Sequence, residues 1–104
     1  MTQDISVLKT DESHERLAQS EVNFAEIQKE MVKISDYINL FPWLSTINPY
    51  SNTYFNSLQI PHLVSELENL SKQNQLTDYK DKIDILISFI KDLQTHDIIR
   101  FVGD

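Results

Sequence analysis

The C-terminal stretch of the chain, TDYKDKIDILISFIKDLQTHDIIRFVGD (residues 77–104), decides the fold. Between residues 78 and 95, apolar residues recur at intervals of three and four, the spacing that gathers side chains on one face of an α-helix. The apolar arc is wide, and we expect it either to be buried on several sides or to contribute one flank to a dimer interface. Its members are Tyr79, Ile83, Ile85, Leu86, Ile87, Phe89, Ile90 and Leu93. The residues after 97 are β-branched and aromatic, which predicts a closing strand.

A short strand is also predicted at the other end of the chain, where Ile5 and Val7 alternate with polar neighbours. We expect this strand to pair with the closing strand and so to tie the two ends of the chain together. Residues 11–13 (DES) predict a turn. The residues that follow, 14–20, fit either a second strand or the approach to a helix.

Two further helices are predicted between the terminal strands. The first covers about residues 21–40, with Ser20 as its N-cap and Pro42 as the residue that stops it. Its apolar stripe consists of Phe24, Ile27, Met31, Ile34, Ile38 and Phe41. The second covers about residues 60–74, with Pro61 in its first turn, and Thr77 is expected to cap the third helix, near 78–95. The sequence therefore predicts an α+β fold, mainly helical, with a small sheet from the N- and C-terminal strands, in a single domain spanning residues 1–104.

Composition and charge exclude several classes of function. The chain has 104 residues, the length of one domain, and its sixteen acidic and nine basic residues give a net charge of −7. An excess of acid repels nucleic-acid phosphate, so direct binding to DNA or RNA is not expected. There is no cysteine, and the single glycine, Gly103, is too few for a phosphate-binding loop. Because no signal-like start and no long apolar run occurs, we expect a cytoplasmic protein that is not bound to a membrane.

One segment, residues 37–65, differs from the rest because it contains no Asp, Glu, Lys or Arg. It holds six of the ten aromatic residues and all three prolines. Trp43 to Ile47 fits a short strand, whereas Tyr50 to Tyr54 are expected in a loop, where recognition residues are often displayed. Aromatic side chains beside short polar ones are typical of binding surfaces, so Trp43, Tyr50, Asn52 and Tyr54 are predicted to contact a partner. The alternative is that the aromatic residues of this segment belong to the core.

A shared pattern covers residues 42–104. The segment NTYFNSLQ (residues 52–59), the pair Glu66-Leu67 and the ending FVGD (residues 101–104) resemble a group of small uncharacterised bacterial proteins. In that group, D-T-x-F-N-x-x-Q precedes a helix that carries E-L, and the chain ends in F-[IV]-G-D. This chain departs from the pattern at Asn52, where Asp is usual, and at Ser51, where Gly is usual. The resemblance implies kinship and no particular activity.

Few residues are spaced for catalysis or metal binding. Of the three histidines (His14, His62 and His96), one has a carboxylate four residues away, since Glu66 follows His62 at i,i+4. A zinc site needs three or four protein ligands, and no third ligand is indicated. The chain also lacks the G-x-S-x-G motif of a nucleophile elbow. We therefore expect no catalytic residue, no metal and no cofactor, and we expect that the protein is not an enzyme.

The function expected from these features is that of a small acidic protein-binding module. Its most concrete form is an immunity protein that neutralises a cognate toxin by occluding its active site. Buried aromatic anchors would supply most of the affinity, and an acidic face of Asp78, Asp81 and Asp84 would steer a basic partner such as a nuclease. Two alternatives remain, a homo-oligomeric structural or regulatory protein, including a homodimer, and a phage-type anti-defence inhibitor that mimics DNA.

Overall fold

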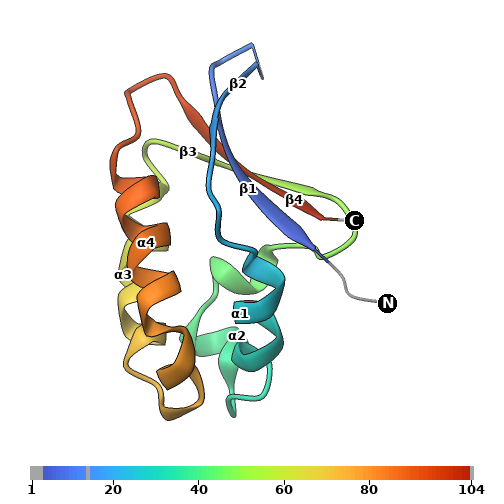
Figure 1. Cartoon of the computed structure of the whole chain (residues 1–104), viewed down its shortest axis with the longest axis vertical. Helices are drawn as coiled ribbons and strands as arrows, with labels where there is room; N and C mark the ends of the chain where they lie inside the picture. The colour runs from blue at the N-terminus through green and yellow to red at the C-terminus, as the bar shows by residue number, and fades with distance from the viewer. Residues whose placement is uncertain (1–3, 14, 104) are drawn as a thin grey trace.

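The fold is α+β, as the sequence predicts, in a computed structural model that describes residues 4–13 and 15–103 (Figure 1). In chain order the elements are β1 (Ile5–Thr10), β2 (Arg16–Gln19), α1 (Phe24–Met31), α2 (Tyr37–Leu40), the 3-10 helix η1 (Leu44–Thr46), β3 (Asn52–Asn56), α3 (Ile60–Ser71), the 3-10 helix η2 (Asn74–Tyr79), α4 (Lys80–Lys91) and β4 (Ile98–Gly103). The segment 14–20, left open above, therefore contains a strand. His14 and the final Asp104 of the FVGD ending lie outside the described residues.

The sheet has four antiparallel strands in the order β2-β1-β4-β3. The predicted pairing of the terminal strands is confirmed, because Ile5 lies opposite Gly103 and Thr10 opposite Ile98. The sheet extends further than predicted, since β3 pairs with the other side of β4. Consequently β4 and β1 are the central strands, and β3 and β2 are the edge strands.

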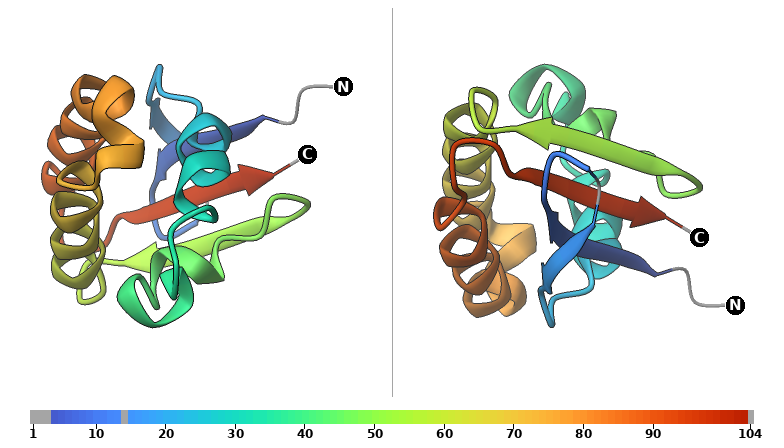
Figure 2. Two further views of the ribbon diagram at one scale, coloured as in Figure 1. Left: turned by 90° about the horizontal axis from the view of Figure 1, so that it is seen from below. Right: turned by 90° about the horizontal axis from the view of Figure 1, so that it is seen from above.

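All helices lie on one side of the sheet, with α1 under its middle and α3 and α4 stacked along one end (Figure 2). Alternate residues of β4 point toward the helices, so Ile99 and Phe101 are fully buried. The Phe101 ring packs edge-to-face against Phe24 of α1 at 5.1 Å and against Phe55 of β3 at 5.7 Å between centroids. These aromatic contacts join the sheet to the helical layer. We call the helix-covered side of the sheet the inner face and the other side the outer face.

The first predicted helix is broken in two. Helix α1 ends at Met31, and α2 begins after Asp36, whose φ of 63° is left-handed and interrupts the helical path. The N-cap of α1 is Asn23 rather than Ser20: the Asn23 side-chain oxygen accepts from the N–H of Ala25 at 3.1 Å. The same oxygen accepts from the N–H of Ile5 at 2.9 Å. One side chain thus caps α1 and fixes the start of β1.

For the later helices, the sequence predicts the middle of each helix more accurately than its ends. Pro61 occupies the first turn of α3, as predicted. Thr77 does not cap the last helix, because it lies within η2, where its hydroxyl donates to the carbonyl of Asn74. Helix α4 starts at Lys80 and ends at Lys91, short of the predicted residue 95. Its buried residues are Ile83, Leu86, Ile87 and Ile90, whereas Ile85 is exposed, so burial does not extend around the whole predicted arc.

Candidate partner-binding surface

The uncharged aromatic segment divides between the core and the surface. The buried members are Phe41, Leu44, Ile47 and Phe55. Tyr50 is 75% exposed, Tyr54 45% and Leu58 82%. Both interpretations of the segment therefore apply, each to different residues, and the exposed tyrosines stand at the start of β3 and within it.

Backbone and side-chain hydrogen bonds hold the turn that carries Tyr50. The N–H of Tyr50 donates to the side-chain oxygen of Asn48 at 2.8 Å, and the N–H of Asn48 donates to the hydroxyl of Thr53 at 3.0 Å. The carbonyl of Ser51 accepts from the N–H of Gly103 at 3.0 Å. The expectation of a loop reaching Tyr54 is wrong, because strand β3 begins at Asn52 and pairs with β4. Tyr54 is thus presented on a paired edge strand, and Tyr50 on the hydrogen-bonded turn that precedes it.

The predicted anchors Tyr50, Asn52 and Tyr54 lie close together. Asn52 and Tyr54 are two residues apart on one strand and point to the outer face, and the Asn52 amide donates to the Tyr54 hydroxyl at 3.3 Å. Opposite Tyr54 in the register is Arg100 of β4, and opposite Arg100 is Leu8 of β1. Sequence reasoning did not single out Arg100, because a lone arginine in a strand gives no signal until its neighbours are known. We call Tyr50, Asn52 and Tyr54 the aromatic edge.

Trp43 is placed differently from the other anchors. The expected strand at 43–47 is wrong, because Trp43 precedes the 3-10 helix η1. Its indole is half-buried, stacks on the His62 ring at 5.2 Å and lies 6.5 Å from the Phe55 ring. Since Phe55 points to the inner face, Trp43 supports β3 from the side opposite to Tyr54.

A buried carboxylate that the sequence reasoning did not assign holds Trp43 in place. Glu66 of α3 is 7% exposed, and its carboxylate accepts from the N–H of Trp43 at 3.0 and 3.1 Å and from the N–H of Leu44 at 2.9 Å. These amides begin η1 and would otherwise lack partners in the core. Because Glu66 is committed to the amides and His62 to Trp43, the i,i+4 pair has a structural role.

The acidic residues Asp78, Asp81 and Asp84 form no joint site with the aromatic edge. They are exposed at the end of η2 and the start of α4, the end of the molecule farthest from the start of β3 (Figures 1 and 2). Lysines accompany them: Lys80 pairs with Asp84 at 3.4 Å, and Lys82 pairs with Glu26 at 2.6 Å. The hydrogen bond to Glu26 raises the pKa of Lys82 above its ordinary value, although desolvation acts in the opposite direction. Lysines thus weaken the acidic field at this end.

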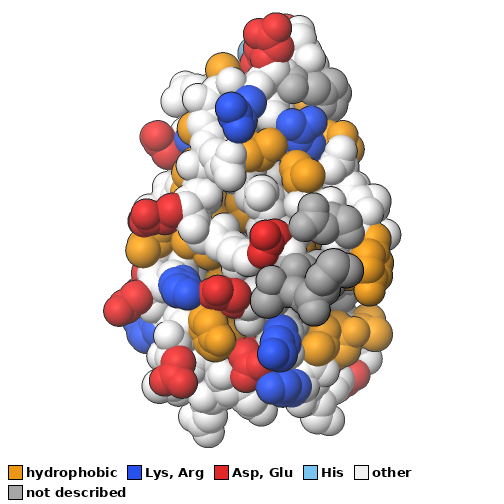
Figure 3. Space-filling model, turned by 45° about the vertical axis from the view of Figure 1, so that its right-hand side comes forward, with side chains coloured by type: hydrophobic (Ala, Val, Ile, Leu, Met, Phe, Trp, Pro, Cys, Tyr) orange, Lys and Arg blue, Asp and Glu red, His pale blue; other side chains and the backbone are white. Residues whose placement is uncertain are grey.

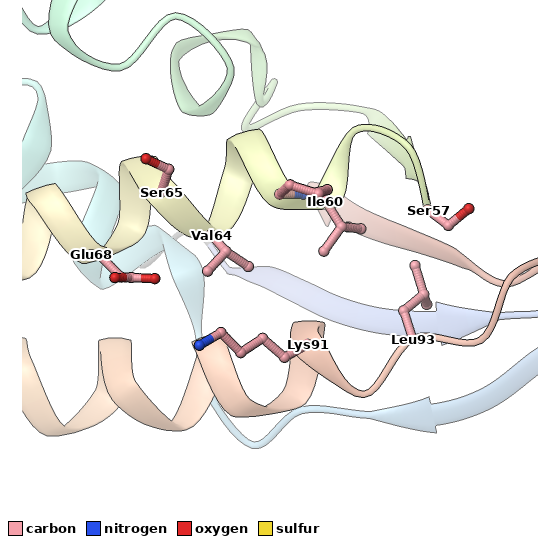
Figure 4. A pocket seen from close by; sticks show the side chains of 8 residues that line it. Ser57, Ile60, Val64, Ser65, Glu68, Lys91 and Leu93 are labelled. Carbon is pink, nitrogen blue, oxygen red and sulfur yellow. The ribbon is translucent and has the colours of Figure 1, made fainter.

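A groove of about 490 Å³ lies between α3 and the end of α4 (Figure 4). It is lined by Ser57, Ile60, Pro61, Val64, Ser65, Glu68, Lys91 and Leu93. Glu68 and Lys91 come from the two facing helices, at the same end of the groove. Residues 4–13 and 15–103 contain no group of three or more His, Asp or Glu arranged to hold a metal ion. Within the same ranges, no helix is long and apolar enough to span a membrane.

The residues of the shared pattern mostly build the turn from β3 to α3. The Asn56 side chain accepts from the N–H of Leu58 at 3.0 Å and of Gln59 at 3.1 Å, and the Gln59 side chain accepts from the N–H of Asn56 at 2.8 Å. Gly103 is required by space, because a Cβ there would lie 2.5 Å from the carbonyl carbon of Pro49. The pattern therefore describes packing and turn geometry. Comparison of the chain with protein-family models, curated proteins and solved structures finds no match, so function is inferred from the surface itself.

Proposed function

We propose that this chain is a small protein-binding module of the immunity or inhibitor type, which contacts its partner through the aromatic edge. The observation that carries the proposal is that Tyr54, 45% exposed, is displayed on edge strand β3 beside Asn52, while Tyr50, 75% exposed, is displayed on the turn that precedes β3. Tyrosines supply large contact areas at low cost in conformational entropy, and the asparagine supplies adaptable hydrogen bonds. Edge strands are also the elements to which a partner strand can be added.

The aromatic edge lacks the charged residues that normally prevent association at an edge strand. Natural edge strands commonly carry charged residues that prevent association, whereas β3 contains none. Its turn is fixed by hydrogen bonds to Asn48 and Thr53, so little ordering is required on binding. Binding here would block a cognate toxin by covering its active site with the end of the molecule that carries β3.

The acidic residues contribute at longer range in this proposal. A net charge of −7 favours the approach of a basic partner such as a nuclease toxin. The molecule measures 37 × 31 × 23 Å, and Asp78, Asp81 and Asp84 are at the far end from the aromatic edge. Since screening in cell-like salt reduces charge effects beyond about 8–10 Å, these residues would affect the rate of encounter more than the contact itself.

A capture experiment tests the proposal. The tagged chain and its Tyr50→Ser/Tyr54→Ser variant are used as baits in extracts of the native host, with mass spectrometry of bound proteins. We expect one stoichiometric partner for the parent chain and at least about a hundredfold less for the variant, because two central anchors are removed. Leu58→Ser is the matched control, since Leu58 is 82% exposed but lies outside the aromatic edge. Equal capture by all three proteins, or capture of the chain alone, would refute the proposal.

A second variant separates contact from steering. Replacing Asp78, Asp81 and Asp84 by Asn is expected to slow association with the captured partner about twofold to tenfold in low salt and to leave dissociation nearly unchanged. Stopped-flow or surface-based kinetics at two salt concentrations measure both rates. A large increase in the dissociation rate would move the contact to the acidic end of the molecule.

One observation favours a homo-oligomer as the second candidate. Val32, Ile38 and Leu40, at the end of α1 and in α2, are all about half exposed. Static light scattering at micromolar concentration distinguishes a homo-oligomer from a monomeric binding module, because a monomer would refute the homo-oligomer. DNA mimicry is less well supported, since acidic side chains are scattered among Lys and Arg on the face seen in Figure 3.

A further inference from the structure

The outer face of the sheet has a cation at its centre. Arg100 lies in β4, an inner strand, with Leu8 opposite it on one side and Tyr54 on the other. No helix covers this face, although β2 crosses above β1 (Figure 2). Arg100 is half-buried, its Nε atom is enclosed, and its register partner Tyr54 belongs to the aromatic edge.

Among the described residues, the Nε atom of Arg100 is the one buried side-chain nitrogen or oxygen without a hydrogen-bond partner. Its guanidinium also takes part in none of the four ion pairs between described residues, all of which use lysines. The chain carries sixteen Asp and Glu residues. A buried guanidinium nitrogen without an acceptor is unusual in so acidic a chain, because buried polar groups are normally hydrogen-bonded.

Lys9 shows what this fold does with a half-buried cation on the inner face. Its ammonium donates to the carbonyl of Asp92 at 3.2 Å, lies 3.7 Å from the Asp92 carboxylate and sits over the Phe89 ring at 5.0 Å. Lys9 is thus satisfied within the chain by three groups. Arg100, one strand away on the opposite face, makes none of these contacts, and its enclosed Nε–H lacks an acceptor within the described part of the chain.

The donors of Arg100 point to a carboxylate as the missing partner. A guanidinium presents planar pairs of N–H groups that match the two oxygens of a carboxylate. The outer-face residues of β1, β3 and β4 around Arg100 are neutral, and they are Ser6, Leu8, Thr10, Asn52, Tyr54, Asn56, Ile98 and Val102. Arg16 of β2, opposite Thr10 in the register, is a second cation on this side of the sheet. Leu8 and Thr10 of β1 are buried, whereas Asn52, Tyr54 and Asn56 of β3 are exposed, so the accessible part of this face is its β3 side. Uncharged polar side chains beside a tyrosine fit a protein surface. Two arginines on a chain of net charge −7 are a poor site for a free polyanion.

We propose that the outer face, with Arg100 at its centre and Tyr54 beside it, is the docking surface for a partner-protein segment that presents a carboxylate to the guanidinium. The inference rests on the proposed function and names the chemistry of its contact. A partner can be basic overall and still place one Asp, Glu or C-terminal carboxylate here. The aromatic edge supplies contact area, and the Arg100–carboxylate pair fixes register.

Nuclear magnetic resonance tests the inference without the natural partner. The probe is the synthetic peptide acetyl-TVEVT-amide, whose β-branched residues favour an extended chain and whose glutamate is its sole charge. The matched probe is acetyl-TVQVT-amide. Each is titrated to about 10 mM, the range of weak peptide binding, against ¹⁵N-labelled protein. We expect the glutamate peptide to shift the Arg100 Nε–Hε signal and the amides of β3 and β4, and the glutamine peptide to bind about tenfold more weakly.

Variants of the protein complete the test. Arg100→Gln is expected to abolish the preference for the glutamate peptide, Arg100→Lys to keep part of it, and Lys91→Gln, an exposed cation on α4, to leave it unchanged. No shift at the highest concentration, equal binding of the two peptides, or an unchanged preference in Arg100→Gln would each overturn the inference. If Arg100→Gln gave no dispersed amide spectrum, Arg100→Lys would decide, and an unchanged preference there would overturn it.

The two proposals can fail separately. In the capture experiment, loss of the partner with Tyr50→Ser/Tyr54→Ser but full capture by Arg100→Gln would retain the binding module and overturn the carboxylate contact. Conversely, peptide binding that requires Arg100, without any captured host protein, would support the contact and refute the proposed module.

Discussion

The two faces of the β3–β4 pair are built from neighbouring residues and have opposite relations to the rest of the chain. On the inner face, Phe55 and Phe101 are buried and pack against each other and against α1. On the outer face, Tyr54 and Arg100 lie opposite each other in the same register, and Tyr54 is 45% exposed. Each inner residue is adjacent in sequence to an outer one.

This difference teaches which residues the fold itself requires. Inner-face residues are specified by burial within this chain, where close packing leaves little tolerance for change. On the outer face the residues of β3 are exposed although Leu8 and Thr10 of β1 are buried, and no contact within the part of the chain that the structure describes accounts for the unpartnered Nε of Arg100. Neighbouring residues on one strand therefore separate folding from recognition.

The largest expected effect comes from the adjacent pair Phe55 and Tyr54. Phe55→Ala is expected to lower the free energy of unfolding by about 3–4 kcal/mol, because it empties a packed aromatic site. Tyr54→Ala is expected to lower it by about 1 kcal/mol or less. Urea denaturation followed by circular dichroism measures both. Equal losses would mean that the outer face is also part of the core.

A second comparison contrasts the buried and exposed carboxylates of α3. Glu66→Ala leaves the amides of Trp43 and Leu44 without acceptors, so we expect a loss of about 2–3 kcal/mol. Glu68→Ala, two residues along and exposed, is expected to change stability by about 0.5 kcal/mol or less. Chemical denaturation measures both losses. The fluorescence of Trp43, the only tryptophan, should shift to longer wavelength in Glu66→Ala alone. An unshifted spectrum with full stability would contradict the role assigned to Glu66.

The third prediction concerns the joint between β4 and the turn that carries Tyr50. A Cβ on residue 103 would lie 2.5 Å from the carbonyl carbon and oxygen of Pro49, so Gly103→Ala must displace the turn. We expect a loss of about 1–3 kcal/mol and changed amide shifts for residues 48–53. Val102→Ala, next to it on the outer face, is expected to cost about 1 kcal/mol or less. Unchanged shifts in Gly103→Ala would show that the turn is not held by this contact.

The parts of the fold that could be predicted from the sequence are those with strong periodicity. The stripe of α3 and the alternation in the terminal strands identify those elements, because burial on one face imposes a regular spacing. Strand β3 was missed because NTYFN has the composition of a turn, and its pairing with β4 depends on contacts distant in sequence. The break at Asp36 is not predicted because the apolar stripe from Phe24 to Phe41 continues through it, although Ile38 is exposed.

The sequence predicts which segment contains the candidate site, and it does not predict which aromatic residues of that segment are exposed. The absence of charge in residues 37–65 identified Tyr50 and Tyr54, but equally Phe41 and Phe55, which are buried. Which of these face outward depends on the pairing of β3. Glu66 did leave a signal, since a carboxylate lies between the apolar positions Leu63 and Leu67 of α3. Arg100 left none, because its significance is the lack of a partner in space.

The smallest predicted effect is a change in the free energy of unfolding, and it has opposite signs for the half-buried cations of the two faces, Arg100 and Lys9. Arg100→Met keeps the apolar stem and removes a half-buried charge without a partner, so stability is expected to stay constant or to rise by about 0.5 kcal/mol. Lys9→Met removes a cation that contacts the Asp92 carbonyl and the Phe89 ring, and is expected to cost about 0.5–1 kcal/mol. Thermal and urea denaturation at one ionic strength measure the pair. A residue whose removal stabilises the isolated chain is retained for another reason, and if Arg100→Met instead cost as much as Lys9→Met, Arg100 would belong to the fold and the distinction between the two faces would fail.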